Sequence, residues 1–263
     1  MAQFHPKQYW EDRLSRNYSL DGVGWQGLGT SYNRWLYRVR RRAFLGALAP
    51  HARQLGDGRV LDVGSGTGFY IDRWKELGIH HICGCDLTDF AIAQLRRRYP
   101  ACSFHVLDIG DALPEPPAET FDAVSCMDVL FHIMDDQRYR TAYANFGRLV
   151  KPGGLLVLTE CRTADKPVRA THMVLRLNAE REALLREAGF DILIRRPVFM
   201  LMVEPYDTQR RVLRLAWSEL YRTLKWFPRL AGPIGAALYW PEVVITSLLR
   251  QGSSHELIVA RRR

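Results

Sequence analysis

The chain has 263 residues, of which 47% are hydrophobic and 25% are charged. This composition is that of a folded globular protein, and it excludes a disordered chain, a collagen-like chain and a disulfide-stapled miniprotein. The formal net charge is +9, and from Arg195 to the C-terminus basic residues outnumber acidic ones by twelve to five, a balance of +7. Such an excess fits an anionic partner of any kind or simple solubility.

The N-terminal segment, residues 1–50, is predicted to end in an amphipathic helix over residues 31–48, with apolar side chains on one face and arginines on the other. From residue 51 to residue 204, apolar runs that indicate strands alternate with stretches of helical periodicity. The predicted strands begin near residues 60, 80, 103, 121, 155 and 191, and a last strand lies within residues 252–263. Regular alternation of this kind predicts a doubly wound, mostly parallel sheet of seven strands with helices on both faces.

A segment over residues 205–251 separates the last two strands and is too long for a simple turn. Its first half predicts an amphipathic basic helix, and residues 230–249 form an apolar stretch that is interrupted by Pro233, Pro241 and Glu242. A central carboxylate is costly inside a bilayer, so this stretch favours packing on the domain or lying at a membrane surface.

The five cysteines are odd in number and lie in or beside apolar runs, which indicates reduced core residues in a cytoplasmic protein. Cys83 and Cys85 stand two apart on a predicted strand, where they would simply share a face, so we expect no metal site. The N-terminus lacks the basic and apolar regions of a signal peptide, which also favours a cytoplasmic location.

The first strand leads into Asp62-Val63-Gly64-Ser65-Gly66-Thr67-Gly68. Glycines at the carboxyl end of a strand let the backbone approach a ligand closely. The G-x-G-x-G spacing differs from the dinucleotide fingerprint, and Asp62 would repel a pyrophosphate, so a cationic ligand is favoured. Asp86 ends the second strand, where it can accept hydrogen bonds from ribose hydroxyls. Asp108 and Ile109 follow the third strand, where they can bind an adenine amine and pack on the ring.

These motifs, together with FDAVSCMDVLFHI and LVKPGGLLVLTE, resemble the class I S-adenosylmethionine-dependent methyltransferases over about residues 60–196. The resemblance implies a methyltransferase with S-adenosyl-L-methionine as its cofactor. Gly64, Gly66 and Gly68 would surround the amino acid moiety, and Met127 would close the pocket. The complete set of expected cofactor-binding residues is Asp62, Gly64, Ser65, Gly66, Gly68, Asp86, Leu87, Asp108, Ile109 and Met127.

Methyl transfer to a hydroxyl requires alignment of the two reactants and removal of a proton. His132 and Glu160 follow the fourth and fifth strands, at the edge where the cofactor methyl would emerge, and they are the candidate bases. Each also has a structural interpretation, since His132 could pack the loop and Glu160 could pair with an arginine such as Arg138.

The fourth strand ends in Ser125-Cys126-Met127-Asp128, without the proline-rich signature of amine methylation on bases, and there is no stacking module for nucleic acid. We therefore expect a small-molecule or lipid-linked acceptor, methylated at oxygen, in a pocket to which Tyr18, Arg138 and Trp217 contribute. Two alternatives stay open. One is methylation at carbon of a prenyl diphosphate, held by Arg138 and Glu160, and the other is a non-catalytic module whose basic C-terminal helices bind a membrane or a partner.

Overall fold

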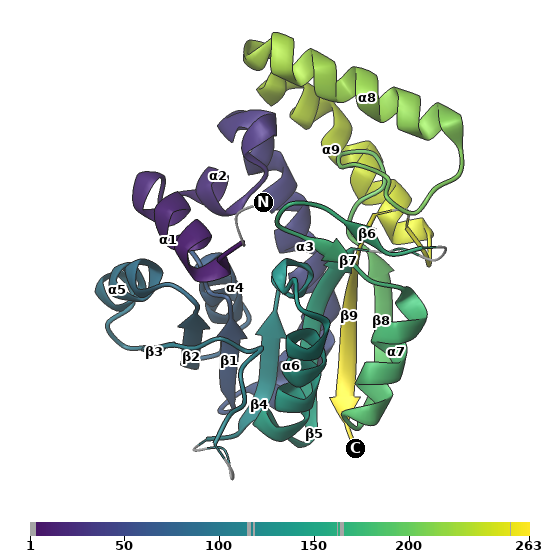
Figure 1. The fold of residues 1–263 in the computed structure, drawn as a ribbon. Coiled ribbons are helices and arrows are strands. Elements are labelled where there is room, and N and C mark those ends of the chain that lie inside the picture. The colour runs from purple at the N-terminus through teal and green to yellow at the C-terminus, as the bar shows by residue number, and fades with distance from the viewer. Residues whose placement is uncertain (1–3, 115–116, 118, 162, 164–165, 253) are drawn as a thin grey trace.

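The computed structural model describes residues 4–114, 117, 119–161, 163, 166–252 and 254–263. Its centre is a seven-stranded sheet in the order β3-β2-β1-β4-β5-β9-β8, in which only β9 runs antiparallel to its neighbours (Figure 1). The predicted doubly wound, mostly parallel sheet is thereby confirmed. The strands of the sheet are β1 (Arg59–Val63), β2 (His81–Asp86), β3 (Ser103–Val106), β4 (Phe121–Cys126), β5 (Val150–Cys161), β8 (Phe190–Pro197) and β9 (His255–Arg262).

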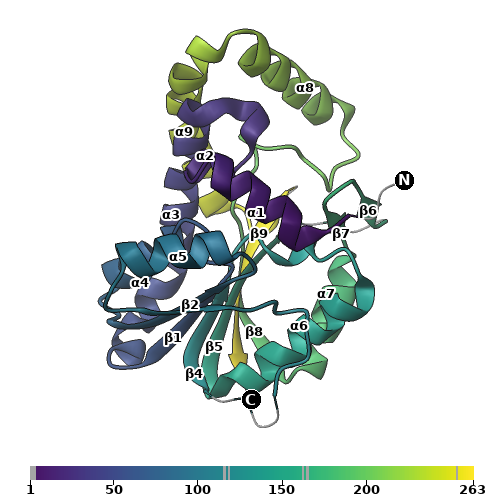
Figure 2. The same ribbon diagram turned by 60° about the vertical axis from the view of Figure 1, so that its left-hand side comes forward.

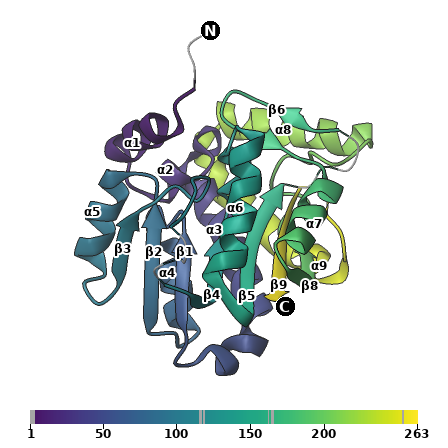
Figure 3. The same cartoon turned by 60° about the horizontal axis from the view of Figure 1, so that its bottom comes forward.

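Helices cover both faces of the sheet, and the strand residues alternate between two buried clusters. One cluster joins the sheet to α3 (Gly29–Leu55), α4 (Phe69–Glu76) and α5 (Asp89–Arg98), and the other joins it to α6 (Asp136–Leu149) and α7 (Asn178–Glu187). Figure 3 shows α6 and α7 in front of the sheet and α3 behind it. Because both faces are covered, the central strands read as continuous apolar runs rather than as alternating ones.

The N-terminal segment has two parts with different surroundings. Helices α1 (Pro6–Arg16) and α2 (Leu20–Val23), followed by the 3-10 turn η1 (Gln26–Leu28), lie above the carboxyl edge of the parallel strands (Figures 1 and 2). By contrast, α3 packs into the core through Leu36, Phe44 and Leu48, all of them at most 1% exposed. The expected boundary at residue 50 therefore falls inside α3, whose second half covers the sheet.

Two long helices, α8 (Arg211–Trp226) and α9 (Ala231–Leu248), form a hairpin between β8 and β9 and are joined by the 3-10 turn η3 (Pro228–Leu230). The carboxylate of Glu242 is fully buried and accepts hydrogen bonds from the backbone N–H groups of Met200, Leu201 and Met202 at 2.5, 2.9 and 2.7 Å. Glu242 thus anchors α9 to the loop after β8. Among the described residues, no helix combines the length and the apolar character that a membrane span requires.

A small hairpin, β6 (Val168–Arg169) with β7 (Val174–Leu175), extends beyond β5 and was not expected from the sequence. Its turn carries His172 beside the short 3-10 segment η2 (Leu130–His132), which follows β4. Two-residue strands of this kind leave almost no periodicity for a sequence pattern to reveal.

Candidate functional site

The glycine-rich turn after β1 has a backbone that only glycine adopts without strain. Gly64, Gly66 and Gly68 have φ values of 73°, 51° and 81°, in the left-handed region. A Cβ on Gly64 would also lie 2.3 Å from a methyl group of Val129. The turn is therefore fixed by its glycines, and its backbone lies open at the carboxyl edge of the sheet.

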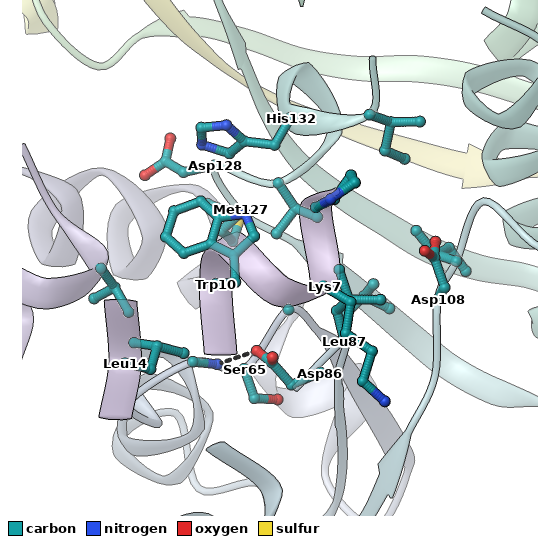
Figure 4. A pocket seen from close by; sticks show the side chains of 18 of the residues that line it. Lys7, Trp10, Leu14, Ser65, Asp86, Leu87, Asp108, Met127, Asp128 and His132 are labelled. Atoms are coloured by element: carbon teal, nitrogen blue, oxygen red, sulfur yellow. Dashed lines mark hydrogen bonds between the residues drawn. The ribbon is translucent and has the colours of Figure 1, made fainter. Parts of the chain in front are cut away.

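Asp86 at the end of β2 holds this turn in place. Its carboxylate accepts hydrogen bonds from the N–H of Gly66 at 2.9 Å and from the N–H and hydroxyl of Thr88 at 3.0 and 2.8 Å (Figure 4). Thr88 in turn caps α5 by accepting from the N–H of Ala91. Burial raises the pKa of Asp86, while these donors oppose the increase.

A cavity of about 790 Å³ opens at this edge. In Figure 4, Trp10 and Met127 lie between the end that holds His132 and Asp128 and the end that holds Asp86 and Leu87. Eight of the ten residues expected to bind the nucleoside ligand line the cavity, namely Gly64, Ser65, Gly66, Asp86, Leu87, Asp108, Ile109 and Met127.

Asp62 and Gly68 do not line the cavity. The Asp62 side chain is 1% exposed and accepts a hydrogen bond from the Ser125 hydroxyl at 2.6 Å, and that hydroxyl also accepts from Trp74 Nε1 at 2.9 Å. Burial raises the pKa of Asp62 to about 7. We expected Asp62 to face the ligand and to repel a phosphate, and this placement is wrong. Successive strand residues face opposite sides of the sheet, and the carboxyl of Asp62 points into the core.

Arg138, expected in the acceptor pocket together with Glu160, lines the cavity and pairs with acids at its nucleoside end. Its guanidinium lies 2.6 Å from Asp108 and 2.9 Å from Asp111. Asp108 also accepts from the N–H of Gly110 at 2.8 Å. Two carboxylates thus neutralise Arg138, and it does not meet Glu160 among the described contacts.

Asp128, directly after β4, is a half-buried anion with an unusual backbone. Its φ of 60° is in the left-handed region, which costs a non-glycine residue about 1–3 kcal/mol and marks many functional sites. Arg40 of α3 donates to its carboxylate at 2.6 Å, and Thr159 of β5 both accepts from its N–H and donates to Oδ1. Burial alone would raise the pKa of Asp128, but Arg40, together with His255, holds it below its usual value. A negative charge is therefore maintained at the wall of the cavity.

Helices α1 and α2 form the roof of the cavity through Lys7, Trp10, Leu14 and Val23. Glu11 accepts from the N–H of Phe90 at 3.0 Å, and this bond fastens α1 to α5. Tyr18, expected to contact the acceptor, instead donates its hydroxyl to the carbonyl of Gly66 at 3.0 Å. Tyr18 therefore clamps the glycine-rich turn and is not among the residues that line the cavity.

His132 lines the cavity with a defined tautomer. Its Nδ1 lies 2.9 Å from the carbonyl oxygen of His172. Because a carbonyl can only accept, Nδ1 carries the proton and Nε2 keeps a free lone pair. Trp10 packs edge-on against the imidazole, with the ring centroids 5.0 Å apart. Burial lowers the pKa of His132 to about 4, so the ring is neutral and able to accept a proton at ordinary pH.

Glu160, the second candidate base, lies outside the cavity wall. It is 3% exposed, accepts a hydrogen bond from the Tyr139 hydroxyl of α6 at 2.9 Å, and feels the charge of Arg181 of α7. Burial raises its pKa to about 7. The side chains of Thr159 and Glu160 alternate across β5, so Thr159 reaches Asp128 and Glu160 reaches the opposite layer. Its expected place at the acceptor site is therefore wrong.

Replacing Glu160 by glutamine is expected to leave the activity within a few-fold and to change the pH dependence of stability. The unfolded chain releases this proton near pH 4.5, whereas the folded protein keeps it until about pH 7. The stabilisation is present below the lower value and is lost as the pH rises, by up to about 1.4 kcal/mol per pH unit in that window. Urea unfolding at several pH values should show a flatter profile for Glu160→Gln, and an equal slope in both proteins would contradict this assignment.

Trp217, also expected at the acceptor pocket, lines a separate cavity under α8. Its ring centroid lies 5.5 Å from that of Trp25, and Tyr221 and Glu204 complete the walls. Trp217 lies on the face of α8 that contacts Trp25 and η1, and not on a face toward the glycine-rich turn. The described cavity at the sheet edge therefore contains no α8 residue.

The sequence analysis missed one residue that lines the cavity and two that contact its wall from outside. Arg40 is 88 residues from its partner Asp128, and His172 is 40 residues from His132, so no local pattern links either pair. Tyr70 of α4 lines the cavity and was not among the expected site residues. Its position in the first turn after the glycines was the only signal that could have marked it.

Comparison with protein families gives a match over residues 60–154 to a family described as a methyltransferase domain. Among curated relatives, a tRNA U34 carboxymethyltransferase of Pseudoalteromonas translucida is 34% identical over 115 residues, which are 42% of this chain and 34% of the relative. A ubiquinone biosynthesis O-methyltransferase of Paracidovorax citrulli is 35% identical over 119 residues, which are 43% of this chain and 46% of the relative. The chain thus spans less than half the length of these two relatives.

Among solved structures, a magnesium protoporphyrin IX methyltransferase of Synechocystis PCC 6803, solved with bound SAM, superposes with a TM-score of 0.58. The two chains are 14% identical, and each is covered completely. At this level of identity the similarity concerns the fold and leaves the acceptor open.

Proposed function

We propose that this chain, which has the fold of the class I S-adenosylmethionine-dependent methyltransferases and a matched methyltransferase domain over residues 60–154, transfers a methyl group to a small or lipid-linked acceptor, at a hydroxyl oxygen. The single observation that carries the choice of oxygen is His132, a neutral imidazole with a free nitrogen at the cavity wall. A hydroxyl acceptor needs a group that removes its proton, and this residue has the required form.

The cavity fits the cofactor of this class in shape and in chemistry. S-adenosyl-L-methionine supplies an electrophilic methyl group on a cationic sulfur. Two buried polar atoms of the wall, Thr67 Oγ1 and the Tyr70 hydroxyl, have no hydrogen-bond partner within the described chain. With the glycine-rich turn, they would hold the amino acid moiety of the cofactor, and the anionic Asp128 lies at the same wall.

The nucleoside half of the cofactor would lie at the other end of the cavity. Asp86 would accept from the ribose hydroxyls, since each carboxylate oxygen has more than one acceptor site. Asp108 with Ile109 and Met127 would hold the adenine between a polar edge and apolar faces. The chain's own contribution is thus binding and alignment, which can supply several kcal/mol of the catalytic effect.

His132 would act on the acceptor and not on the cofactor. The bond from its Nδ1 to the carbonyl of His172 fixes the ring orientation, and the packing of Trp10 excludes water from one side. Nε2 would take the proton of the acceptor hydroxyl. The low pKa of about 4 means that the protonated ring readily passes the proton on.

The alternatives are less well supported. The hypothesis of carbon methylation on a prenyl diphosphate required Arg138 and Glu160 to act together. Arg138 pairs with Asp108 and Glu160 binds Tyr139, so the two residues do not form one site. RNA as the acceptor has the support of several relatives named for tRNA and of one named for the mRNA cap, which resemble this chain over 42–54% of its length. A non-catalytic module would have no need for a fixed imidazole tautomer at a buried cavity wall.

The test is transfer of label from methyl-labelled S-adenosylmethionine in an extract of the source cells, followed by separation of lipid, small-molecule, protein and RNA fractions. We expect the label in the lipid or small-molecule fraction. It should resist mild acid treatment, and mass spectrometry should identify it as a methyl ether. Label in RNA or protein would overturn the acceptor class. Cofactor binding without label in any fraction would favour the non-catalytic alternative.

A further inference from the structure

The turn between α8 and α9 exposes an apolar tip with no cover from the rest of the described chain. It consists of six consecutive exposed residues, which we call the α8–α9 tip: Lys225, Trp226, Phe227, Pro228, Arg229 and Leu230. Trp226 is 72% exposed, Phe227 55% and Leu230 44%. Large apolar side chains of this kind are uncommon on a protein surface when they stand together and mark interaction sites.

The tip is held out by buried residues on both sides. Leu224 just before it and Ala231 just after it are each 2% exposed and belong to the main core cluster. Pro228 begins η3 and fixes the backbone between the two helices. The exposure of Trp226 and Phe227 therefore results from a firmly packed hairpin, and not from a frayed helix end.

The charge of the tip has one sign. Lys225 and Arg229 flank the aromatic residues, and the tip contains no acidic residue. Within the part of the chain that the structure describes, no ion pair joins either cation to a carboxylate. Aromatic side chains beside free cations are the composition that proteins use at the interface of an anionic bilayer.

We propose that the α8–α9 tip inserts into the headgroup region of an anionic lipid membrane. A second copy of this chain is a poorer occupant, because a twofold contact would bring the same cations face to face. A protein partner is also disfavoured, since three apolar side chains are far fewer than the 20–30 residues that a standard interface of about 800 Å² per partner requires. Shallow insertion of a few aromatic and aliphatic side chains is sufficient for reversible membrane binding.

The position of the tip fits this inference. In Figures 1 and 2, the turn between α8 and α9 lies at the top of the molecule, on the side where α1 and α2 cover the carboxyl edge of the strands. The inference deepens the proposed function and rests on it in one respect, the lipid-linked acceptor. Membrane binding at the tip would bring the enzyme to such an acceptor.

The experiment is co-sedimentation of the full chain with vesicles of phosphatidylcholine, alone or mixed with phosphatidylglycerol, without cofactor. We expect binding to the mixed vesicles to exceed binding to phosphatidylcholine by about tenfold or more and to fall with salt. The double variant Trp226→Ser with Phe227→Ser is expected to bind the mixed vesicles about tenfold more weakly. Lys225→Glu with Arg229→Glu should abolish the preference for anionic lipid.

The matched control is Val212→Ser with Leu215→Ser, at the opposite end of α8, where the side chains are 76% and 63% exposed. Its binding should stay within twofold of the unaltered protein, and each variant should keep the melting temperature. Absence of binding to anionic vesicles would overturn the inference, as would equal loss in the control. A dimer that dissociates in the Trp226→Ser, Phe227→Ser variant would assign the tip to a second copy instead. Because vesicle binding needs no turnover, failure here leaves the methyl-transfer test unaffected.

Discussion

His132→Ala is expected to lower the rate of methyl transfer by about 100- to 10,000-fold while leaving cofactor affinity nearly unchanged. Two described histidines line the cavity, His5 and His132; His5 is exposed, whereas the ring of His132 is held through Nδ1 by the carbonyl of His172, which leaves Nε2 as a basic nitrogen. Its loss removes the group that accepts the hydroxyl proton. The measurement is kcat with the acceptor identified by the labelling experiment, together with the affinity for S-adenosylhomocysteine.

The control for this variant is His172→Ala. The bond that orients His132 ends on the main-chain oxygen of His172, which alanine keeps, and the alanine variant loses only ring packing, against His132 at 5.7 Å and against Tyr9 at 5.6 Å. We therefore expect at most a few-fold decrease. If the two variants lost activity equally, the local packing would matter and the role of His132 as the base would be refuted.

The pH profile gives a second readout for the same residue. A base whose pKa is about 4 is unprotonated above about pH 5, so the rate should be flat from pH 6 upward and fall only in more acidic solution. An unshifted histidine would instead give a fall beginning near pH 7. A profile with its midpoint near 6.5 would show that the base is not the imidazole of His132.

Asp86→Ala is expected to weaken binding of S-adenosylmethionine and its demethylated product by about 1–3 kcal/mol, a factor of about 5 to 150 in Kd. The substitution removes an acceptor for the ribose hydroxyls and also the bond that holds the N–H of Gly66. Isothermal titration with S-adenosylhomocysteine measures the change directly.

Two further variants make this result interpretable. Asp57→Ala removes an exposed carboxylate in the turn before β1 and should leave the affinity unchanged. Asp86→Asn keeps one acceptor oxygen and is the fallback if the alanine variant does not fold. Unaltered affinity in a folded Asp86 variant would exclude this carboxylate from cofactor binding.

The elements of the sheet and the nucleoside end of the cavity could be predicted because their signals are local. Each strand is a short apolar run, and each expected ligand group stands where a run ends, so parallel strands bring these groups to one edge. Gly64, Asp86 and Ile109 illustrate this, since all three line the cavity. The direction of the Asp62 side chain was predicted wrongly, because the helices that pack on each face of the sheet decide which strand residues face the core.

The catalytic end was decided by contacts distant in sequence. His132 after β4 and Glu160 near the end of β5 looked equivalent in the sequence. In the structure, η2 turns His132 into the cavity, and the pleat of β5 turns Glu160 toward α6 and α7. Arg40 reaches Asp128 only because α3 packs across the sheet.

The sequence by itself thus determined the parallel sheet, the glycine-rich turn and the acidic residues that follow β2 and β3. Only the tertiary structure decided which carboxylates stay charged, which histidine tautomer faces the cavity and which apolar residues remain exposed at the α8–α9 tip. The physical reason is that hydrophobic periodicity and turn geometry act within a few residues, whereas burial and charge depend on every element packed around a side chain.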